Sequence, residues 1–420
     1  IGEQGKLTPE LQAAIEAAPT KQELEDLYLP FKPRRRTKGM IAREAGLEPL
    51  ADRLFADPAL DPAAEAAGFV AAYPGGMAAL AEAGYADAHA VLDGVRDLLS
   101  ERWAEDAVLV GQLREWLWET GLLRSRLVEG KDGNHPDAAK FRDYFDYDEP
   151  IRQVPSHRAL AVFRGRTQEW LDAKLALDEE PAPARAAGTA VAPVVTLAEG
   201  RIARHLGWSH RQRQGDELIR KSIAWTWKVK LSLSLERDLF TRLREQAEAV
   251  AIKVFGDNLR DLLLAAPAGK RVVMGLDPGI RTGVKVAVVS DTGKVLDTAT
   301  VYPHEPRRDV EGTLHTLARL VAAHGVNLIA IGNGTASRET DQVATELIKR
   351  IARLAPDVVV DKVVVSEVGV LVYSASEYAS HELPELDVSL RGAVSIACRL
   401  QDPLVELVKI DPKNIGVGQY

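Results

Sequence analysis

The stretch Arg271–Ser290, RVVMGLDPGIRTGVKVAVVS, decides the fold of the second half of the chain. Two apolar runs, 272–276 and 284–289, are rich in β-branched residues, which favour strands. Asp-Pro-Gly and Thr-Gly between them interrupt regular structure and permit positive φ, so the stretch predicts a hairpin. Asp277 is the acid at the mouth of the turn, which makes it the first candidate functional residue.

The residues after the hairpin predict alternating strands and helices. Strands are expected at 295–302, 328–331 and 361–365. Apolar residues at helical spacing predict three helices, marked by Val310, Leu314, Leu317 and Val321, by Val343, Leu347, Ile351 and Leu354, and by the run 389–400. Right-handed crossovers would bring the ends of strands 272–276 and 328–331 side by side. We therefore expect a site at that edge of the sheet.

The chain from Leu7 to about Ala265 is predicted to be helical. Thr20–Glu23 is typical of a capping box, and Asp61-Pro62 supplies an N-cap followed by proline at the first helical position. Two stretches rich in Gly, Pro or Ala, near 130–136 and 180–193, predict exposed connections that would subdivide this region.

The composition limits the classes of protein. A length of 420 residues predicts two to four domains at roughly 150 residues each. With a formal net charge of -8, contact with nucleic acid must come from local patches. Cys398 is the only cysteine, which excludes a disulfide framework and fits a reducing compartment. No apolar run approaches the roughly 20 residues of a membrane span, so a cytoplasmic protein is predicted. The start at Ile1 without methionine suggests a piece excised from a longer protein.

Four longer motifs are spread along the chain: DLYLPFKPRRRT at 26–37, GLDPGIRTG at 275–283, IGNGTASRET at 331–340 and DVSLRGAVSIA at 387–397. They resemble the Tex family of transcription accessory proteins, which contain a YqgF domain of the ribonuclease-H-like superfamily. The resemblance implies a multidomain α plus α/β fold.

In that family fold, 1–268 would be a helical amino-terminal region with a helix-turn-helix-like piece. Residues 271–403 would be the YqgF domain, a three-layer ribonuclease-H-like α/β domain, and 404–420 the start of a linker to a helix-hairpin-helix region. No pattern of the family's RNA-binding S1 domain is present in the chain.

Active relatives in the superfamily cleave phosphodiesters with several carboxylates that converge on divalent cations, since one acid alone binds Mg²⁺ weakly. The resemblance matches Asp277 and Glu367 to two of these acids. Asn333 stands where the resolvase RuvC has glutamate, and Ser389-Leu390-Arg391 where YqgF and RuvC proteins have aspartate. Glu339, Asp341 or Asp387 could substitute from nearby turns, but nothing in the sequence requires it. We therefore expect vestigial carboxylates, no intact catalytic set and no cofactor. Two roles stay open for Asp277: weak Mg²⁺ binding, and capping of its own Pro-Gly turn.

Two basic segments, 32–38 and 201–230, contrast with the net negative charge of the chain. The second one, 201–230, has a net charge of +6 and interleaved tryptophans, which are more often core residues than stacking platforms. Tyr28 and Phe31, beside the first segment, could stack on an unpaired base. The alternative for the first segment is a solvated loop without a binding role. We predict contacts with a phosphate backbone from Lys32, Arg34, Arg35, Arg36 and Lys38 of the first segment and from Arg211, Arg213, Lys228 and Lys230 of the second.

The sequence predicts a transcription accessory factor that binds RNA or single-stranded DNA and works beside RNA polymerase or ribosome-associated machinery, with an inactive YqgF domain and no membrane contact. One alternative is a metal-dependent, structure-selective nuclease of the Holliday-junction resolvase type, and another is a protein-binding scaffold for the transcription machinery. A third is an ATPase, because Gly275-x-Asp277-x-Gly279 also resembles the first phosphate loop of actin-like ATPases. The second glycine-acid hairpin that such a fold needs is absent before Tyr420.

Overall fold

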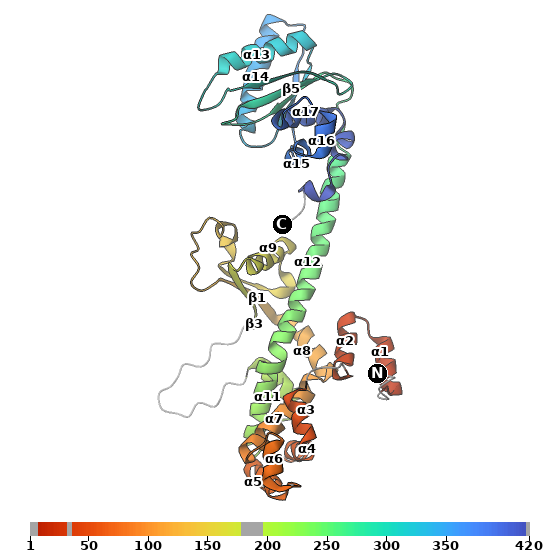
Figure 1. The fold of residues 1–420 in the computed structure, drawn as a ribbon, viewed down its shortest axis with the longest axis vertical. Helices are drawn as coiled ribbons and strands as arrows, with labels where there is room; N and C mark the ends of the chain where they lie inside the picture. Colours follow the sequence, from red (N-terminus) through yellow and green to blue (C-terminus); the bar gives the residue numbers. More distant parts are fainter. Residues whose placement is uncertain (1–6, 32–35, 178–195, 417–420) are drawn as a thin grey trace. The chain divides into compact units, whose positions relative to one another are not determined.

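The computed structural model describes residues 7–31, 36–177 and 196–416. The chain divides into two compact units, Ile1–Glu248 and Ala249–Tyr420 (Figure 1). The long helix α12 (Ser232–Leu263) begins in the first unit and ends in the second. The predicted connection at 180–193 lies outside the described residues.

The first unit is mainly helical, as predicted. Its helices are α1 (Pro9–Ala17), α2 (Lys21–Tyr28), η2 (Leu29–Phe31), α3 (Lys38–Glu44), α4 (Glu48–Ala56), α5 (Pro62–Ala72), α6 (Gly76–Glu82), α7 (Ala88–Ala104), α8 (Ala107–Thr120), α9 (Ser156–Thr167), α10 (Leu197–His205), α11 (Asp216–Trp225) and η5 (Thr226–Leu231), followed by the first turns of α12. Thr20 and Asp61 cap α2 and α5 as predicted, because their side chains accept hydrogen bonds from amides of the first turn.

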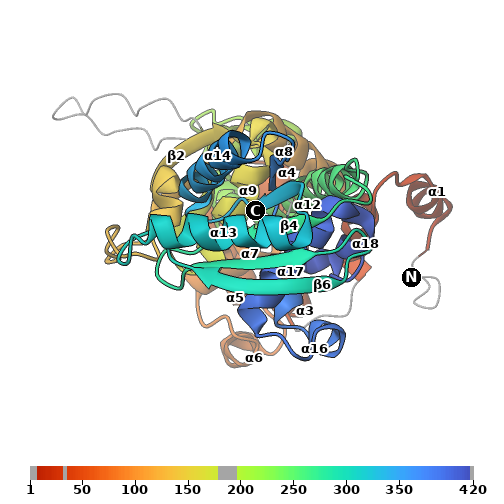
Figure 2. The ribbon, with the colours of Figure 1, turned by 90° about the horizontal axis from the view of Figure 1, so that it is seen from above.

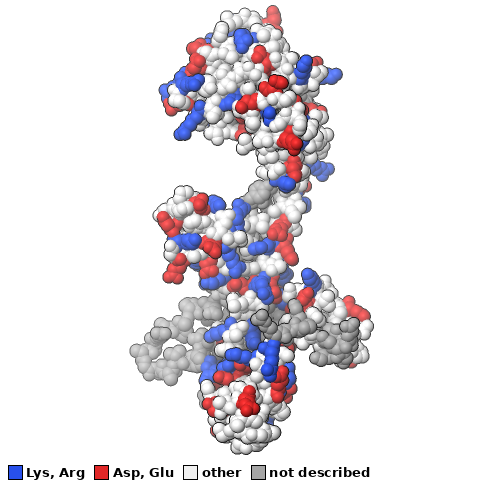
Figure 3. Space-filling view, viewed as in Figure 1, with Lys and Arg blue, Asp and Glu red and all other residues white. Residues whose placement is uncertain are grey.

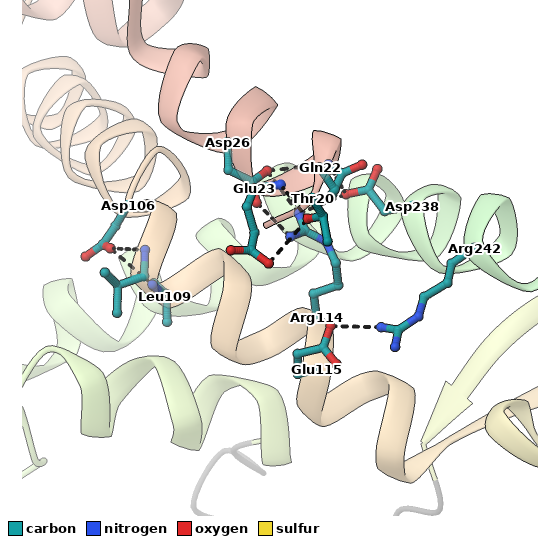
Figure 4. A network of polar contacts seen from close by, with 11 residues as sticks. Thr20, Gln22, Glu23, Asp26, Asp106, Leu109, Arg114, Glu115, Asp238 and Arg242 are labelled. Carbon is teal, nitrogen blue, oxygen red and sulfur yellow. Dashed lines mark hydrogen bonds and ion pairs between the residues drawn. The ribbon is translucent and has the colours of Figure 1, made fainter. Parts of the chain in front are cut away.

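A buried ionic network joins α2, α8 and α12 within the first unit (Figure 4). Arg114 of α8 donates to Asp26 of α2 and to Asp238 of α12. Gln22 of α2 also donates to Asp238, at 3.3 Å. Since the Arg114 and Asp26 side chains are only 7% and 10% exposed, α2 is held to α8 by charges that water does not screen.

The first unit also contains a three-stranded antiparallel sheet, which the sequence analysis did not predict. Its strands are β1 (Gly121–Leu127), β2 (Asp146–Pro150) and β3 (Leu171–Leu177), in the order β2-β1-β3. Arg124 and Arg126 of β1 pair with Asp148 of β2, which places charged residues on one face and weakens the apolar signal of the strands. The stretch near 130–136 connects β1 to η3 (Ala139–Tyr144), and η4 (Ile151–Gln153) follows β2.

The second unit has the predicted five-stranded mixed sheet. Its strands are β4 (Val273–Asp277), β5 (Val284–Val289), β6 (Val295–Val301), β7 (Leu328–Gly332) and β8 (Asp361–Val365), in the order β6-β5-β4-β7-β8. β4, β5 and β6 form an antiparallel meander, whereas β7 pairs in parallel with both β4 and β8. Three antiparallel strands followed by two parallel ones, with β4 in the centre, form the ribonuclease-H-like sheet.

Helices cover both faces of this sheet (Figures 1 and 2). α13 (Val310–His324) and α14 (Ser337–Leu354) pack on one face, and Figure 2 shows α13 alongside β6. α17 (Val388–Gln401) packs on the other face against Val273 and Ala330. Shorter helices complete the unit: α15 (Val370–Ser374), α16 (Glu377–Glu382), α18 (Pro403–Leu407) and η6 (Pro412–Asn414). The predicted three-layer domain is therefore present, and the chain forms α15 and α16 before it reaches α17.

In the described part of the chain, none of the helices has the length and apolar character needed to cross a bilayer.

Candidate functional site

A cavity of about 440 Å³ lies at the carboxyl end of β4 in the second unit, where the sequence predicted a site. Asp277, the last residue of β4, lines it together with Glu367, which follows β8. The other wall comes from the start of α17, including Ser389 and Gly392. The fold thus brings the two predicted carboxylates to one cavity although 90 residues separate them in the sequence.

The Asp277 carboxyl is the most strongly perturbed acid in this cavity. Burial, and after it the negative charge of Glu367, raises the pKa of Asp277 to about 6, while the Lys285 ammonium opposes the shift. A Cβ on Gly392 would lie 2.6 Å from Asp277 Oδ2, so glycine at this position of α17 leaves room for the carboxylate. The Asp277 carboxyl therefore lies partly buried between the sheet and α17.

Lys285 lies beside Asp277 and is a candidate that the sequence analysis did not single out. It is the antiparallel partner of Asp277 across the hairpin, is only 9% exposed, and its Nζ donates to the carbonyl oxygens of Thr282 and Gly283. Burial lowers the pKa of Lys285, against the attraction of Asp277 and Asp387. The signal was available in the sequence, since a lysine interrupts the apolar run 284–289.

The turn that carries Glu367 is fixed by two polar side chains. Asn333, which directly follows β7, accepts a 3.0 Å hydrogen bond from the Glu367 amide. Arg399 of α17 donates through Nη1 to the carbonyls of Ser366 and Val368, both at 2.7 Å. A Cβ on Gly332 would lie 2.7 Å from Glu367 Oε2, so the carboxylate rests over the end of β7. Asn333 therefore orients the turn here instead of supplying a charge.

Arg391 and Asp387, at the start of α17, both make hydrogen bonds within the second unit. The Arg391 guanidinium donates to the carbonyls of Leu383 and Ser374 and to Ser380 Oγ, and is itself buried. It braces α17 and is not among the residues that line the cavity. Asp387 caps α17 by accepting hydrogen bonds from the amide and hydroxyl of Ser389. No cluster of three or more His, Cys, Asp or Glu side chains suited to a metal ion occurs within the ranges 7–31, 36–177 and 196–416.

The capping role considered for Asp277 is not supported. Among the residues that the structure describes, no amide of the 278–283 turn donates to its carboxylate, and Lys285 satisfies two carbonyls of that turn instead.

The first predicted basic segment is described only in part. Lys32, Arg34 and Arg35 lie outside the described residues. Arg36 is exposed and forms an ion pair with Glu44, and Lys38 is exposed at the start of α3. The described side chains are thus on the surface, as phosphate contact requires, but Arg36 already has a partner.

The second predicted basic segment is partly structural. Arg213 donates to both oxygens of the fully buried Asp216, which also accepts from the Arg211 amide and the Trp208 indole. Although burial alone would raise it, these hydrogen bonds hold the pKa of Asp216 well below its usual range. Arg213 therefore braces the turn between α10 and α11 and is less available for phosphate.

The other predicted side chains of this segment differ in their exposure and in their contacts within the chain. The Arg211 guanidinium is exposed and donates to Ser209 Oγ, and Lys228 of η5 is exposed. Lys230 Nζ lies 3.8 Å from Glu101 Oε2. The Arg96 guanidinium lies 4.2 Å from the Trp225 ring centroid, so that ring face is covered and cannot stack on a base.

Charges of both signs intermingle on the face drawn in Figure 3. This distribution agrees with the net charge of -8, so binding of an anion would have to come from small groups of basic residues.

Two family models match the chain: a Tex central region-like model at residues 57–255 and a Tex protein YqgF-like domain model at residues 271–401. Protein tex of Bordetella pertussis is 58% identical over 425 residues, which cover 100% of this chain and 51% of the relative. Transcriptional accessory protein Tex of Neisseria gonorrhoeae is 51% identical over 422 residues, with the same coverage. S1 RNA-binding domain-containing protein 1 of Homo sapiens is 32% identical over 435 residues, which cover 100% of this chain and 40% of the relative.

The chain thus spans about half the length of the bacterial relatives. A matched Tex region covers most of each unit, and the second unit has the ribonuclease-H-like sheet that a YqgF domain requires. The chain belongs to the Tex family of transcriptional accessory proteins.

Proposed function

We propose that this chain is the part of a transcription accessory factor that binds nucleic acid, with a preference for RNA, and that its YqgF domain does not cleave the strand it binds. The names of two relatives, a transcriptional accessory protein and an S1 RNA-binding domain-containing protein, support the transcription setting and the choice of RNA. Contact with RNA polymerase or ribosome-associated machinery, and a cytoplasmic location, are parts of the same proposal.

The observation that carries the non-catalytic part is the composition of the cavity at the end of β4. Metal-assisted phosphodiester cleavage requires carboxylates that hold cations against both the attacking and the leaving oxygens. Asp277 and Glu367 are the acids at the two matching positions, whereas Asn333 and Ser389 bring no charge. The buried Lys285 adds a positive charge beside Asp277. Asp387, the third carboxylate that lines the cavity, is engaged by the amide and hydroxyl of Ser389. These residues do not fit a two-cation site.

The nuclease alternative has one observation in its favour. Asp277 and Glu367 still lie close enough for the charge of one to raise the pKa of the other, as in paired carboxylates of working sites. We rank it second, because the remaining two positions lack acids.

The scaffold alternative rests on exposed apolar side chains in the second unit. Val359 and Val364, before and within the edge strand β8, are 68% and 52% exposed, and Leu371 of α15 is 79% exposed. Exposed apolar residues that gather on an edge favour contact with another protein. This role is compatible with nucleic-acid binding.

The test is a binding titration of the chain with labelled single-stranded RNA, single-stranded DNA and duplex DNA of matched sequence over a salt series. We expect binding to RNA to be tightest and to weaken linearly in log-log form as salt rises, because phosphate contacts release counterions. Equal, salt-independent affinities, or an absence of binding to all three at low salt, would refute the proposal. Tighter binding to duplex DNA than to RNA would favour the nuclease alternative.

A further inference from the structure

A second cavity, of about 240 Å³, lies in the first unit between α8 and α10, remote in sequence from the carboxylate cavity. Six residues line it, none of them acidic: Leu109, Gln112, Leu113, Arg201, Arg204 and His205. Each helix contributes one face, since 109, 112 and 113 are spaced three and four apart on α8, and 201, 204 and 205 on α10. Two buried leucines form its apolar floor, and the polar side chains surround it.

Two arginines line this cavity. The Arg201 guanidinium lies over the Trp116 ring, with Cζ 4.4 Å from the ring centroid, and this cation–π contact uses none of its N–H donors. Within the described residues, neither Arg201 nor Arg204 forms an ion pair, although both are exposed. Guanidinium groups without a carboxylate partner keep their full charge for an anion.

The acid that contacts His205 is already engaged. Asp106 caps α8 by accepting from the amides of Val108 and Leu109, and its Oδ2 lies 2.8 Å from His205 Nε2. Burial acts to raise the pKa of Asp106, but these hydrogen bonds and His205 hold it below its usual range. The aspartate thus fixes the imidazole at the wall of the cavity, and its charge is offset by the amino-terminal end of α8.

We propose that this cavity is a phosphate-binding pocket in which Arg201 and Arg204, assisted by the Gln112 amide, hold the oxygens of one phosphate group. Two guanidinium groups and an amide supply more N–H donors than a carboxylate can accept, but they match the oxygens of a phosphate. The volume is below the roughly 300 Å³ at which pockets for whole small molecules begin. The pocket therefore takes a phosphate with part of its ester, either from a nucleic-acid strand or from a free phosphate compound.

The pocket lies in the first unit, and phosphate binding there does not depend on the proposed preference for RNA. The experiment uses the whole chain labelled with fluorotryptophan and observed by fluorine NMR. The Trp116 signal among those of the seven tryptophans is assigned with Trp116→Phe. Inorganic phosphate, acetate and a single-stranded RNA are added separately at constant ionic strength. The variant R201Q/R204Q removes both guanidinium groups. The matched control K140Q/R142Q removes two exposed charges of η3 in the same unit.

We expect phosphate to move the Trp116 signal saturably in the wild type and in the control, and R201Q/R204Q to weaken that binding by about tenfold or more. A response to RNA that R201Q/R204Q also weakens would identify a nucleic-acid strand as the source of the phosphate. A response to inorganic phosphate without one to RNA would support the pocket and assign it to free phosphate compounds, even if the proposed function fails. No response to phosphate, an equal response to acetate, or an equally weakened response in the control would overturn the inference.

Discussion

The Arg114 guanidinium in α8 holds the Asp26 carboxylate in α2 through two hydrogen bonds, Nη1 to Oδ2 at 2.6 Å and Nη2 to Oδ1 at 3.0 Å. Both groups are buried, and Asp238 of α12 shares the same guanidinium. Removing the arginine would leave two shielded carboxylates without their cation. Arg114→Ala should therefore lower the free energy of unfolding by about 3–5 kcal/mol.

Urea denaturation followed by circular dichroism checks this prediction. Arg152→Ala is the control, because it breaks an exposed ion pair with Glu119 of the same helix α8 and should cost under about 1 kcal/mol. Equal costs for the two variants would show that the buried network does not stabilise the first unit.

Gly275 of β4 leaves no room for a side chain. A Cβ there would overlap the carbonyl oxygen of Ala393 and lie 3.0 Å from the Ala397 Cβ in α17. Since neither the backbone of α17 nor the central strand can move without disturbing the core, Gly275→Ala should destabilise the second unit by about 3 kcal/mol. The control is Gly256→Ala in α12, where nothing lies within 4 Å, and it should stabilise by about 0.5–1 kcal/mol. Thermal unfolding of both variants measures the contrast, and a neutral Gly275→Ala would contradict the tight packing of α17 on β4.

Asp277 should make stability depend on pH. Its pKa is raised to about 6, chiefly by burial and then by Glu367, so the folded chain binds the proton more tightly than the unfolded chain. A raised carboxyl pKa adds stability as the pH falls through the folded pKa, and the ionised form costs stability above it. Asp277→Asn should therefore raise the free energy of unfolding at about pH 8, by up to about 3 kcal/mol, and change it little near pH 4.

Chemical denaturation of Asp277→Asn and wild type at several pH values tests this dependence. Asp291→Asn, in the exposed β5–β6 turn, serves as the control and should show no such trend. A destabilised Asp277→Asn at pH 8 would mean that the attraction between Asp277 and Lys285 outweighs burial.

The cavity at the end of β4 should not support cleavage. With Mg²⁺ or Mn²⁺ present, we expect the wild type to leave branched, duplex and single-stranded substrates intact, because Asn333 and Ser389 carry no charge and the third carboxylate of the cavity, Asp387, is engaged as the cap of α17. Asp277→Asn should leave nucleic-acid binding nearly unchanged. Gel analysis of both proteins decides the matter: metal-dependent cutting by the wild type that disappears in the variant would establish the nuclease alternative.

The first basic segment should contribute to binding without sequence preference. Replacing Arg34, Arg35 and Arg36 by alanine should weaken binding to every sequence alike and flatten the log-log salt slope by about 0.7–0.9 for each phosphate that the variant no longer binds. Fluorescence anisotropy over a salt series measures the slope. A variant with alanine at the exposed Lys140, Arg142 and Arg152 removes the same charge elsewhere in the first unit. An unchanged affinity at low salt, or an equally weakened affinity in that control, would remove the segment from the binding surface.

The sequence by itself determined the second unit. The β-branched runs and the turn residues between them are local signals, so strand β5 was predicted at 284–289, β8 at 361–365 and β4 within one residue of its observed bounds. The order of strands and helices and the right-handed crossover then fixed β4 beside β7. For the same reason Asp277 could be placed at the edge where the cavity lies.

Only the tertiary structure decided which charged side chains are free. The sequence could not distinguish Arg213, which neutralises the buried Asp216, from Arg204, which makes no ion pair within the described residues. Nor could it show that Lys285 points to the turn carbonyls, or that Arg399 and Asn333 hold the Glu367 turn.

The three-stranded sheet was missed because β1 ends at Leu127, whereas its two partner strands begin only at Asp146 and Leu171. Such pairings join residues far apart in the chain. Their energies depend on burial and partners that local patterns of hydrophobicity and charge do not encode.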